Sequence, residues 1–226
     1  MRTPTHSGRC DADYFAPRYV KLERALAECP HRKVALGTLS PSLAGGSTPT
    51  RAEEELYATS GVKFLRILNV KSNEIDVDDV KYITQNVNDK LLGRSQLQTN
   101  DVLMTITGRV GTAAVVPTNT LPANINQHIV RLRLGTKDCL PEYLAAYLNS
   151  SLGLALSNRD VSGGTRIALD YEAVRRIQIP IPPLDVQQRI VSEVNRRREE
   201  AQRLRMQATR DWNVAKADFE RALLTK

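Results

Sequence analysis

The sequence predicts an α/β (α+β) domain followed by one long C-terminal helix of the coiled-coil type. Residues 97–117 carry two alternating, β-branched segments joined by the glycine-flanked turn GRVG, which is typical of a β-hairpin. Residues 185–226 contain neither glycine nor proline, and their apolar or small residues recur every three or four positions. At 226 residues, the chain is long enough for one domain with its own core and an appended helix.

Before the hairpin, the pattern predicts short elements separated by loops. An amphipathic helix is expected within residues 11–29, ending before Pro30. Residues 34–50 are rich in glycine, proline and serine, so a strand end and a loop are expected there. Residues 61–77 are expected to form a strand, a turn at Ser72–Asn73 and a second short strand.

Around and after the hairpin, the pattern alternates between helix and strand. Residues 86–96 are expected to form one or two helical turns. Residues 125–134 are expected to form a further strand, with Ile125, Gln127, Ile129, Arg131 and Arg133 on one side and the intervening residues on the other. Residues 141–158 change to helical spacing and begin with a proline, which is favoured in a first helical turn. A last short strand is expected in residues 176–182.

The C-terminal helix is expected to begin at an Asp185 N-cap, with Gln188 completing a capping box. A helix of about 40 residues, at 1.5 Å each, is roughly 60 Å long. This helix packs either along its own domain or against another helix. Its length favours packing against another helix, and so do the small residues in its seam, the line of apolar and small side chains along one face. The expected dimerisation residues are Ile190, Val194, Ala201, Leu204, Ala208, Trp212, Ala215 and Phe219.

The composition indicates a soluble protein and is compatible with a polyanionic partner such as nucleic acid. The net charge is +7. The segment from Asp185 to Lys226 contains ten Lys or Arg and seven Asp or Glu, so the excess of basic charge is spread along the chain and not concentrated in one segment. No apolar run reaches the roughly 18 residues of a membrane span, and no signal peptide is visible. Cys10, Cys29 and Cys139 fit neither a disulfide framework nor a zinc site, and a cytoplasmic location is expected.

We find no convincing catalytic group, metal site or cofactor motif in the sequence. His6, His31 and His128 are isolated, and neither a phosphate-binding G-x-x-x-x-G-K-S/T loop nor a G-x-S-x-G nucleophile elbow occurs. The glycine-rich loop and Asn-Pro-Pro-aromatic tetrapeptide of adenine methyltransferases are also absent. Residues 74–81 cluster carboxylates with a lysine, as metal nucleases do, but such stretches are more often solvated turns. The chain is therefore expected to be non-catalytic, without metal or cofactor.

Several loops have the composition of nucleic-acid contacts. GGSTPTR at 45–51 and SGGTR at 162–166 combine glycines, hydroxyls and an arginine, which suits contacts to phosphate, although each is also an ordinary surface loop. In the major groove, Arg and Lys read guanine and Asn reads adenine. Candidates for phosphate or guanine contact are Lys63, Arg66, Lys71, Arg94, Arg109 and Arg166. Candidates for reading bases or positioning the backbone are Asn69, Thr105, Thr107, Asn126, Gln127 and Thr165.

Taken together, these stretches resemble a target recognition domain of a type I restriction-modification specificity subunit. The resemblance runs, in order, through DADYFAPRYVKLE, GGSTPTR, VKFLRILNV, LQTNDVLMTITGRVGTAAVVP, PEYLAAYLNSSLG and IPIPPLDVQQRIV. It implies a DNA target recognition domain at residues 1–183 and, at residues 184–226, a conserved helix that acts as a spacer and docks methyltransferase subunits. Specificity subunits usually hold two such domains whose helices pair antiparallel, whereas this sequence resembles half a subunit.

The resemblance further implies recognition of a bipartite site in double-stranded DNA, together with type I methyltransferase (M) and restriction (R) subunits. The partner helix is expected from a second copy, as a homodimer, or from another half-length specificity subunit. The alternative is a non-catalytic assembly adaptor or regulator that binds a methyltransferase or specificity subunit through its helix with little DNA affinity. A small nuclease using the carboxylates of residues 74–81 is a third hypothesis, from a different class.

Overall fold

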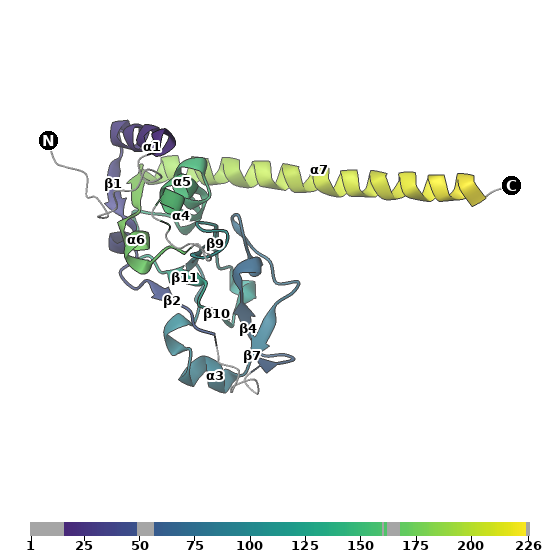
Figure 1. Cartoon of the computed structure of the whole chain (residues 1–226), viewed down its shortest axis with the longest axis horizontal. Helices are drawn as coiled ribbons and strands as arrows, with labels where there is room; N and C mark the ends of the chain where they lie inside the picture. The colour runs from purple at the N-terminus through teal and green to yellow at the C-terminus, as the bar shows by residue number, and fades with distance from the viewer. Residues whose placement is uncertain (1–15, 49–56, 160, 162–167, 225–226) are drawn as a thin grey trace. The chain divides into compact units, whose positions relative to one another are not determined.

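The computed structural model describes residues 16–48, 57–159, 161 and 168–224 of the chain. The chain divides into two compact units, Met1–Gln187 and Gln188–Lys226. The first unit is a mixed α/β domain, and the second is the continuation of one long helix (Figure 1). The expected fold class is therefore confirmed. Within the described ranges, no helix has the length and hydropathy that crossing a membrane would require.

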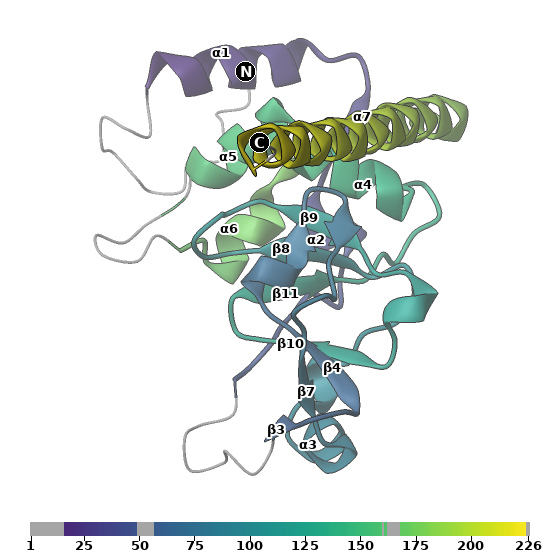
Figure 2. The same ribbon diagram turned by 90° about the vertical axis from the view of Figure 1, so that its right-hand side faces the viewer.

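Two four-stranded sheets form the centre of the first unit (Figures 1 and 2). The hairpin sheet is antiparallel throughout and has the order β2 (Ala44–Gly45), β11 (Ile129–Leu132), β8 (Val102–Thr105) and β9 (Ala113–Val115). The mixed sheet has the order β10 (Ala123–Ile125), β4 (Val62–Leu65), β7 (Lys81–Ile83) and β3 (Tyr57–Ala58). In the mixed sheet, β10 and β4 run parallel and the other neighbours antiparallel.

Two smaller strand pairs and several helices complete the described structure. The strand pairs are antiparallel and consist of β1 (Arg32–Ala35) with β12 (Gln178–Ile181), and β5 (Val70–Lys71) with β6 (Glu74–Ile75). The α-helices are α1 (Pro17–Glu28), α2 (Leu36–Leu39), α3 (Gln85–Lys90), α4 (Pro141–Leu148), α5 (Ser151–Arg159), α6 (Tyr171–Arg176) and α7 (Leu184–Leu224). The 3₁₀ turns are η2 (Ile67–Asn69), η3 (Gly93–Ser95) and η4 (Thr118–Thr120).

The core follows from the alternation of side chains along β4, because neighbouring residues of a strand face opposite sides of a sheet. Val62 and Phe64 are buried on one side, in a cluster that includes Val87 of α3. Leu65 is buried on the other side, in a larger cluster that also contains Leu103 of the hairpin sheet. One strand of the mixed sheet therefore contributes to two apolar clusters, and the larger cluster joins the two sheets.

Most short elements lie where the sequence predicts them. The amphipathic segment is α1, the hairpin is β8 with β9, and the turn at Ser72–Asn73 separates β5 from β6 with Asn73 at φ 58°. Two short helical turns, α3 and η3, occupy residues 85–95. The strand expected in residues 61–77 is interrupted at Arg66, and the loop expected in residues 34–50 contains the one-turn helix α2.

The single strand predicted for residues 125–134 is wrong. The chain leaves the mixed sheet after Ile125, turns through Asn126–His128 and enters the hairpin sheet at Ile129. In the turn, the Asn126 side chain accepts a hydrogen bond from the backbone N–H of His128 at 3.2 Å, as asparagine commonly does in turns. Apolar and polar residues alternate only from Val130 to Leu134, and the prediction extended the strand through the polar residues of this turn.

The single helix predicted for residues 141–158 is also interrupted, at Asn149. The side-chain oxygen of Asn149 accepts from the Ala113 N–H at 3.0 Å, and its amide donates to the Ala113 carbonyl at 2.7 Å and to Asn73 at 3.0 Å. These bonds attach the end of α4 to the edge of the hairpin sheet. The chain then starts a new helix, α5, at Ser151.

The long helix begins at Leu184, one residue before the predicted cap. Asp185 therefore lies in the first turn, and the predicted N-cap at Asp185 is wrong. The carbonyl of Pro183 accepts hydrogen bonds from the N–H groups of Val186 and Gln187, at 3.0 and 3.1 Å. Proline has no N–H to satisfy, so it can occupy the residue before a helix without leaving a donor unpaired.

Gln187 holds the first turn of α7 in the first unit. Its side chain is fully buried and donates to the carbonyls of Asp138 and Pro182, at 2.7 and 2.8 Å. Its side-chain oxygen accepts from the N–H of Leu140 at 2.9 Å. These three bonds join the strand exit, the start of α4 and the start of α7 at one amide group.

We expect Gln187→Ala to lower the free energy of unfolding by about 2 kcal/mol, because it removes a fully buried amide that satisfies three backbone groups. Gln188→Ala is the matched control, since Gln188 is exposed, and it should change the stability by less than about 0.5 kcal/mol. Urea unfolding of both variants measures the difference. Equal stability of the two variants would contradict this role of Gln187.

Candidate nucleic-acid interface

Loops from separate parts of the sequence meet at one place in the first unit. We call this the loop cluster and define it as residues 45–48, 106–109, 126–128 and Ala168. The Thr48 hydroxyl bonds the Gln127 side chain, and the Thr107 hydroxyl lies 2.8 Å from Nδ1 of His128. Thr107 also forms an antiparallel bridge with Ala168. The described part of the GGSTPTR stretch, the hairpin tip with Thr107 and Arg109, and the candidates Asn126 and Gln127 are thereby brought together.

Backbone contacts fix the loop cluster to both sheets. The N–H of Asn126 donates to the carbonyl of Leu65 at the end of β4, at 3.1 Å. The N–H of Ile106, after β8, donates to the carbonyl of His128 at 3.0 Å, and the N–H of Gly46 donates to Ile129 at 3.2 Å. The cluster is therefore built on strand ends, which hold loop side chains in more defined positions than a free loop would.

Gly46 allows the closest backbone approach in this cluster. A Cβ atom at this position would lie 2.1 Å from the carbonyl oxygen of Ile125 and 2.3 Å from that of Asn126. Both distances are far below van der Waals contact, so no other residue fits without displacing the turn. The neighbouring Gly45 is covered in the same way by the hydroxyl of Tyr171, which would lie 1.8 Å from a Cβ.

Two candidate residues in the loop cluster are open to a ligand. Arg109 at the hairpin tip and Gln127 in the turn between the sheets are exposed. Thr107 is half-buried, and its hydroxyl is engaged with His128. The exposed pair offers one guanidinium and one amide from different loops, the group types that contact phosphate and base edges.

Three other candidates are buried and bonded to the protein itself. Asn69 is fully buried, accepts from the N–H of Arg66 at 2.9 Å and donates to the carbonyl of Asp76 at 2.9 Å. The Thr105 hydroxyl donates to the Arg109 carbonyl, which fixes the hairpin tip. Asn126 closes its own turn, as described above. These side chains position the loops, so we leave them out of the proposed contact surface.

The basic residues beside the cluster have acidic partners. Arg66 donates to the carbonyl of Asp79 at 2.8 Å and to its carboxylate at 3.2 Å, while Lys71 lies 3.6 Å from the carboxylate of Asp76. Gly108 at the hairpin tip lies close to Ile67, the residue after Arg66, because a Cβ at position 108 would lie 3.2 Å from Cδ1 of Ile67. Asp76 and Asp79 of residues 74–81 thus serve as counter-ions, which favours the structural interpretation of that stretch over a nuclease site.

The remaining candidates lie outside the loop cluster or outside the described residues. Lys63 is half-buried in β4, opposite Tyr82 of β7, and Arg94 is exposed in η3. Thr165 and Arg166 lie outside the described residues. The structure therefore unites Thr107, Arg109, Asn126 and Gln127, places Ile67 beside the hairpin tip, and leaves Lys63 and Arg94 apart.

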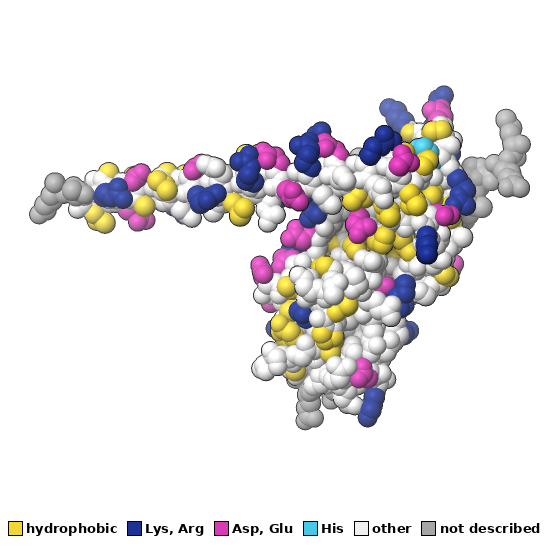
Figure 3. Space-filling model, turned by 180° about the vertical axis from the view of Figure 1, so that it is seen from behind, with side chains coloured by type: hydrophobic (Ala, Val, Ile, Leu, Met, Phe, Trp, Pro, Cys, Tyr) yellow, Lys and Arg dark blue, Asp and Glu magenta, His cyan; other side chains and the backbone are white. Residues whose placement is uncertain are grey.

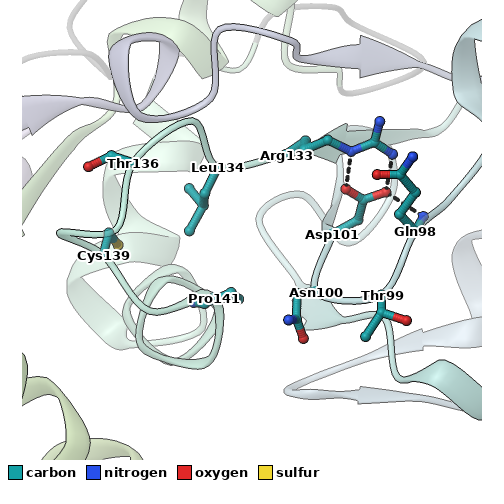
Figure 4. A pocket seen from close by; sticks show the side chains of 9 residues that line it. All are labelled: Gln98, Thr99, Asn100, Asp101, Arg133, Leu134, Thr136, Cys139 and Pro141. Carbon is teal, nitrogen blue, oxygen red and sulfur yellow. Dashed lines mark hydrogen bonds and ion pairs between the residues drawn. The ribbon is translucent and has the colours of Figure 1, made fainter.

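One pocket of about 220 Å³ lies between the turn before β8 and the start of α4 (Figure 4). On its wall, Arg133 donates two hydrogen bonds of 2.7 Å to the carboxylate of buried Asp101, and this bonding raises the pKa of Arg133. Burial, with Asp138 nearby, raises the pKa of the Cys139 thiol to about 12. The thiol stays protonated at neutral pH and is a poor nucleophile, so the pocket offers no activated catalytic group.

No grouping of three His, Cys, Asp or Glu side chains that could hold a metal ion occurs among the described residues. Residues 33–196 match the sequence model of the Type I restriction modification DNA specificity domain. The chain belongs to this specificity-domain family. The match spans both sheets, every described part of the loop cluster and the first turns of α7.

Individual relatives agree with the family assignment. The type I restriction enzyme EcoBI specificity subunit of Escherichia coli is 26% identical over 137 residues, which cover 59% of this chain and 28% of that protein. The HsdS subunit from Thermoanaerobacter tengcongensis has a similar fold, with a TM-score of 0.55 and 21% identity over 80% of this chain and 43% of that chain. A chain from a structure of type I R-M complex assembly gives a TM-score of 0.59, also at 21% identity, covering 82% of this chain and 45% of the other.

This specificity-family chain therefore spans less than half the length of each of these relatives. A similar fold, with a TM-score of 0.58 at 11% identity, also occurs in the type IIG restriction endonuclease BpuSI, where this chain covers 28% of the other. The fold is thus found both in separate specificity chains and within a longer restriction enzyme.

Sequence reasoning missed two members of the cluster, Thr48 and His128. His128 was interpreted as isolated because its partner Thr107 is 21 residues away, on a different loop. Thr48 lies in the glycine-rich stretch that the composition singled out, but its partner Gln127 is 79 residues away. The polar run Asn126-Gln127-His128 was the available signal, since three successive polar residues seldom continue a buried strand.

We expect Gly46→Ala to lower the free energy of unfolding by about 2 kcal/mol, because the methyl group collides with two backbone carbonyls of the turn. Gly93→Ala is the control, since a Cβ there meets nothing within 4 Å, and its effect should stay below about 1 kcal/mol. Thermal unfolding measures both. A Gly46→Ala protein as stable as the Gly93→Ala protein would show that the described approach of the two loops is wrong.

Proposed function

We propose that this chain is a DNA-recognition part of a type I restriction-modification specificity subunit. The observation that carries the proposal is the loop cluster, where four separated loops expose an arginine and an amide on a frame of strand ends. The match of residues 33–196 to the DNA specificity domain supports the same function. Specificity subunits are by family non-catalytic, so the role assigned to the chain is recognition rather than DNA cleavage or methylation.

In the proposed mechanism, the loop cluster enters a groove of double-stranded DNA and reads one part of a bipartite site. Gln127 would contact a base edge, while Arg109 would contact guanine or phosphate. Arg66 precedes Ile67, which lies beside the hairpin tip, and would add positive charge near the backbone, as would Lys71, although each is partly neutralised by its own carboxylate. Buried Asn69, Thr105 and Asn126 would contribute by holding these loops in place.

The proposed partners follow from the family. The helix of residues 184–226 would act as a spacer and as a docking surface for the type I methyltransferase subunits, with which a restriction subunit would assemble. Its seam would pair with a second helix, from a second copy of the chain or from another specificity helix. The recognition domain, assigned to residues 1–183, would then provide one of the two recognition surfaces in the assembly.

We expect Arg109→Ala and Gln127→Ala to weaken binding of the cognate duplex. If Gln127 reads a base, its replacement weakens the binding free energy by about 1 to 3 kcal/mol and relaxes the specificity at one position of the site. A phosphate contact by Arg109 would instead weaken all sequences alike and lower the salt dependence. Arg24→Ala is the control, because Arg24 is an exposed arginine on α1, far in sequence from the cluster. Fluorescence anisotropy at several salt concentrations, on a duplex first selected from a random library, measures these effects.

The result that would reject the proposed contact surface is unchanged DNA affinity in the Arg66→Ala, Arg109→Ala and Gln127→Ala variants. If the intact chain binds a methyltransferase subunit but selects no duplex from the library, the adaptor function is supported instead. Turnover of DNA by the chain alone with Mg²⁺ would support the nuclease hypothesis.

A further inference from the structure

His128 is a member of the loop cluster to which the sequence pattern assigned no function. Its ring nitrogen Nδ1 lies 2.8 Å from the hydroxyl of Thr107, and its carbonyl accepts from the N–H of Ile106 at 3.0 Å. Its neighbour Gln127 bonds Thr48 of another loop. His128 therefore joins the hairpin tip to the turn between the two sheets, and its carbonyl and one ring nitrogen are both engaged.

The second ring nitrogen of His128, Nε2, has no hydrogen-bond partner among the described residues. The side chain is only half-buried. In the described structure, the buried side-chain atoms that lack a partner belong to Ser40, Arg66 and Arg131, so Nε2 is not one of them. This nitrogen is therefore open to a ligand that approaches the loop cluster.

The Thr107 hydroxyl determines which ring nitrogen of His128 carries the proton. Among the described residues, this hydroxyl bonds only Nδ1 of His128. When the hydroxyl donates to Nδ1, the proton of a neutral imidazole lies on Nε2. We assign this arrangement because it pairs the hydroxyl hydrogen within the protein. The same hydroxyl accepts from Nδ1–H once the ring is doubly protonated, so Nε2 is a donor in both charge states.

A donor at this position suits the acceptors that DNA presents. Guanine offers N7 and O6 in the major groove, and each phosphate offers anionic oxygens. The amino groups of adenine and cytosine are donors, so an N–H at Nε2 disfavours contact with them. The exposed Arg109 and Gln127 belong to the same cluster and can contact the same duplex from neighbouring positions.

The ionisable groups on the segments packed around His128 carry both signs. They are Arg109 on the hairpin tip, Asp170 and Tyr171 after the bridge of Thr107 with Ala168, and the Arg66–Asp79 ion pair after β4. Residues 45–48 contain no ionisable side chain. A bound duplex would add phosphates to this set, and negative charge close to an imidazole favours its protonated form.

Basic side chains are dispersed on the face of the first unit that Figure 3 shows. The Lys and Arg side chains lie apart from one another there, with Asp and Glu among them. Arg66 and Lys71, which the sequence suggested as DNA contacts, are each paired with a carboxylate. One additional positive charge within the loop cluster would therefore add appreciably to the attraction of DNA.

We propose that His128 is a further DNA-contacting residue, which donates from Nε2 to an acceptor of the duplex and takes up a proton as the complex forms. Thr107 is then a positioning residue, because it acts on DNA only through the ring of His128. This inference rests on the proposed function, since it deepens the DNA recognition assigned to the loop cluster. The acceptor is either the major-groove edge of guanine or a phosphate oxygen.

DNA should bind more tightly as the pH falls. Since the protonated ring has the higher affinity, its contribution is complete at low pH and is lost as the pH rises and the bound imidazole deprotonates. Uptake of one proton changes the affinity by at most about tenfold per pH unit. We expect the intact chain to bind its selected duplex at least about threefold more tightly at about pH 6 than at about pH 7.5. Fluorescence anisotropy at constant ionic strength measures the change.

Two amide variants separate the DNA contact from a structural role of the ring. The amide of glutamine lies as many bonds from the backbone as Nε2 of histidine, whereas the amide of asparagine reaches only as far as Nδ1. At about pH 7.5, His128→Gln should bind DNA within about threefold of the unmodified chain, and its affinity should not depend on pH. His128→Asn can still bond Thr107 but should bind at least about tenfold more weakly at about pH 6.

The reverse order of these two variants, with His128→Asn the tighter binder, would overturn the proposal, because the ring would then serve only to hold Thr107. Circular dichroism at both pH values checks that each variant is folded. His31→Gln is the matched control, since His31 is also half-buried but lies outside the loop cluster. This variant should keep the full pH dependence, and so should His6→Gln.

Thr107 variants test the positioning role. Thr107→Val should weaken DNA binding and reduce its pH dependence, and Thr107→Ser, which retains the hydroxyl, should restore both. In the His128→Asn protein, Thr107→Val should cause no further loss of affinity, because two residues that act through one contact do not have additive effects. Additive losses would overturn the role assigned to Thr107.

Selection of duplexes from a random library at both pH values separates the two acceptors. Relaxed selectivity at one guanine in His128→Asn indicates a base contact, whereas uniform weakening with a smaller salt dependence indicates a phosphate contact, and either supports the proposal. Selection of a duplex whose affinity is independent of pH overturns this inference and leaves the proposed function intact. A chain that selects no duplex at either pH contradicts both.

Discussion

The arrangement of the recognition unit depends on one short crossing of the chain between its two sheets. Asn124 is fully buried in the mixed sheet, where its amide donates to the Asn88 side chain at 2.9 Å and to the Leu92 carbonyl at 3.0 Å. Two residues later, Asn126 is tied to the end of β4, and the carbonyl of His128 accepts from the strand end after β8. If this crossing moved, the loops on both sheets would move with it. The position of this crossing is therefore set by hydrogen bonds to both sheets rather than by the loops themselves.

This construction separates residues that hold the surface from residues that form it. Asn69 and Thr105 have buried polar atoms bonded to loop backbones, and leaving such a partner unsatisfied costs about 1 to 3 kcal/mol. Arg109 and Gln127 are exposed, so their replacement leaves no buried group unpaired. The exposed positions can change with little effect on stability, whereas the buried ones cannot. A fold of this kind can acquire new binding specificity through a few surface residues while its frame stays the same.

The sequence was informative wherever local pattern determines structure. The hairpin of β8 and β9 and the long helix follow from alternation, turn glycines and the absence of helix breakers, and the structure has them where expected. Elsewhere the structure depends on tertiary contacts, which the local sequence pattern does not predict. The break at Asn149 depends on Ala113, which lies 36 residues away. In the candidate site, residue type suggested Thr105 and Thr107 equally as DNA contacts, yet Thr105 is buried and Thr107 borders the exposed tip. Burial depends on the neighbouring strands, and no local periodicity contains that information.

The seam of α7 is the line of residues 190, 194, 197, 201, 204, 208, 212, 215, 219 and 222. Its two consecutive four-residue steps, on either side of Ala208, affect how a helix of this kind can change in length. Steps of four, three and four make an eleven-residue repeat of about 3.67 residues per turn, and the seven-residue repeats beside it have 3.5. A straight helix has about 3.6, so the mixture keeps the seam on one side with little supercoiling. Inserting a single residue would rotate everything beyond it by about 100° and carry half of the seam off the partner. A longer version of this helix keeps its seam nearly continuous by gaining four, seven or eleven residues at once, so its length changes in increments of about 6, 10 or 16 Å.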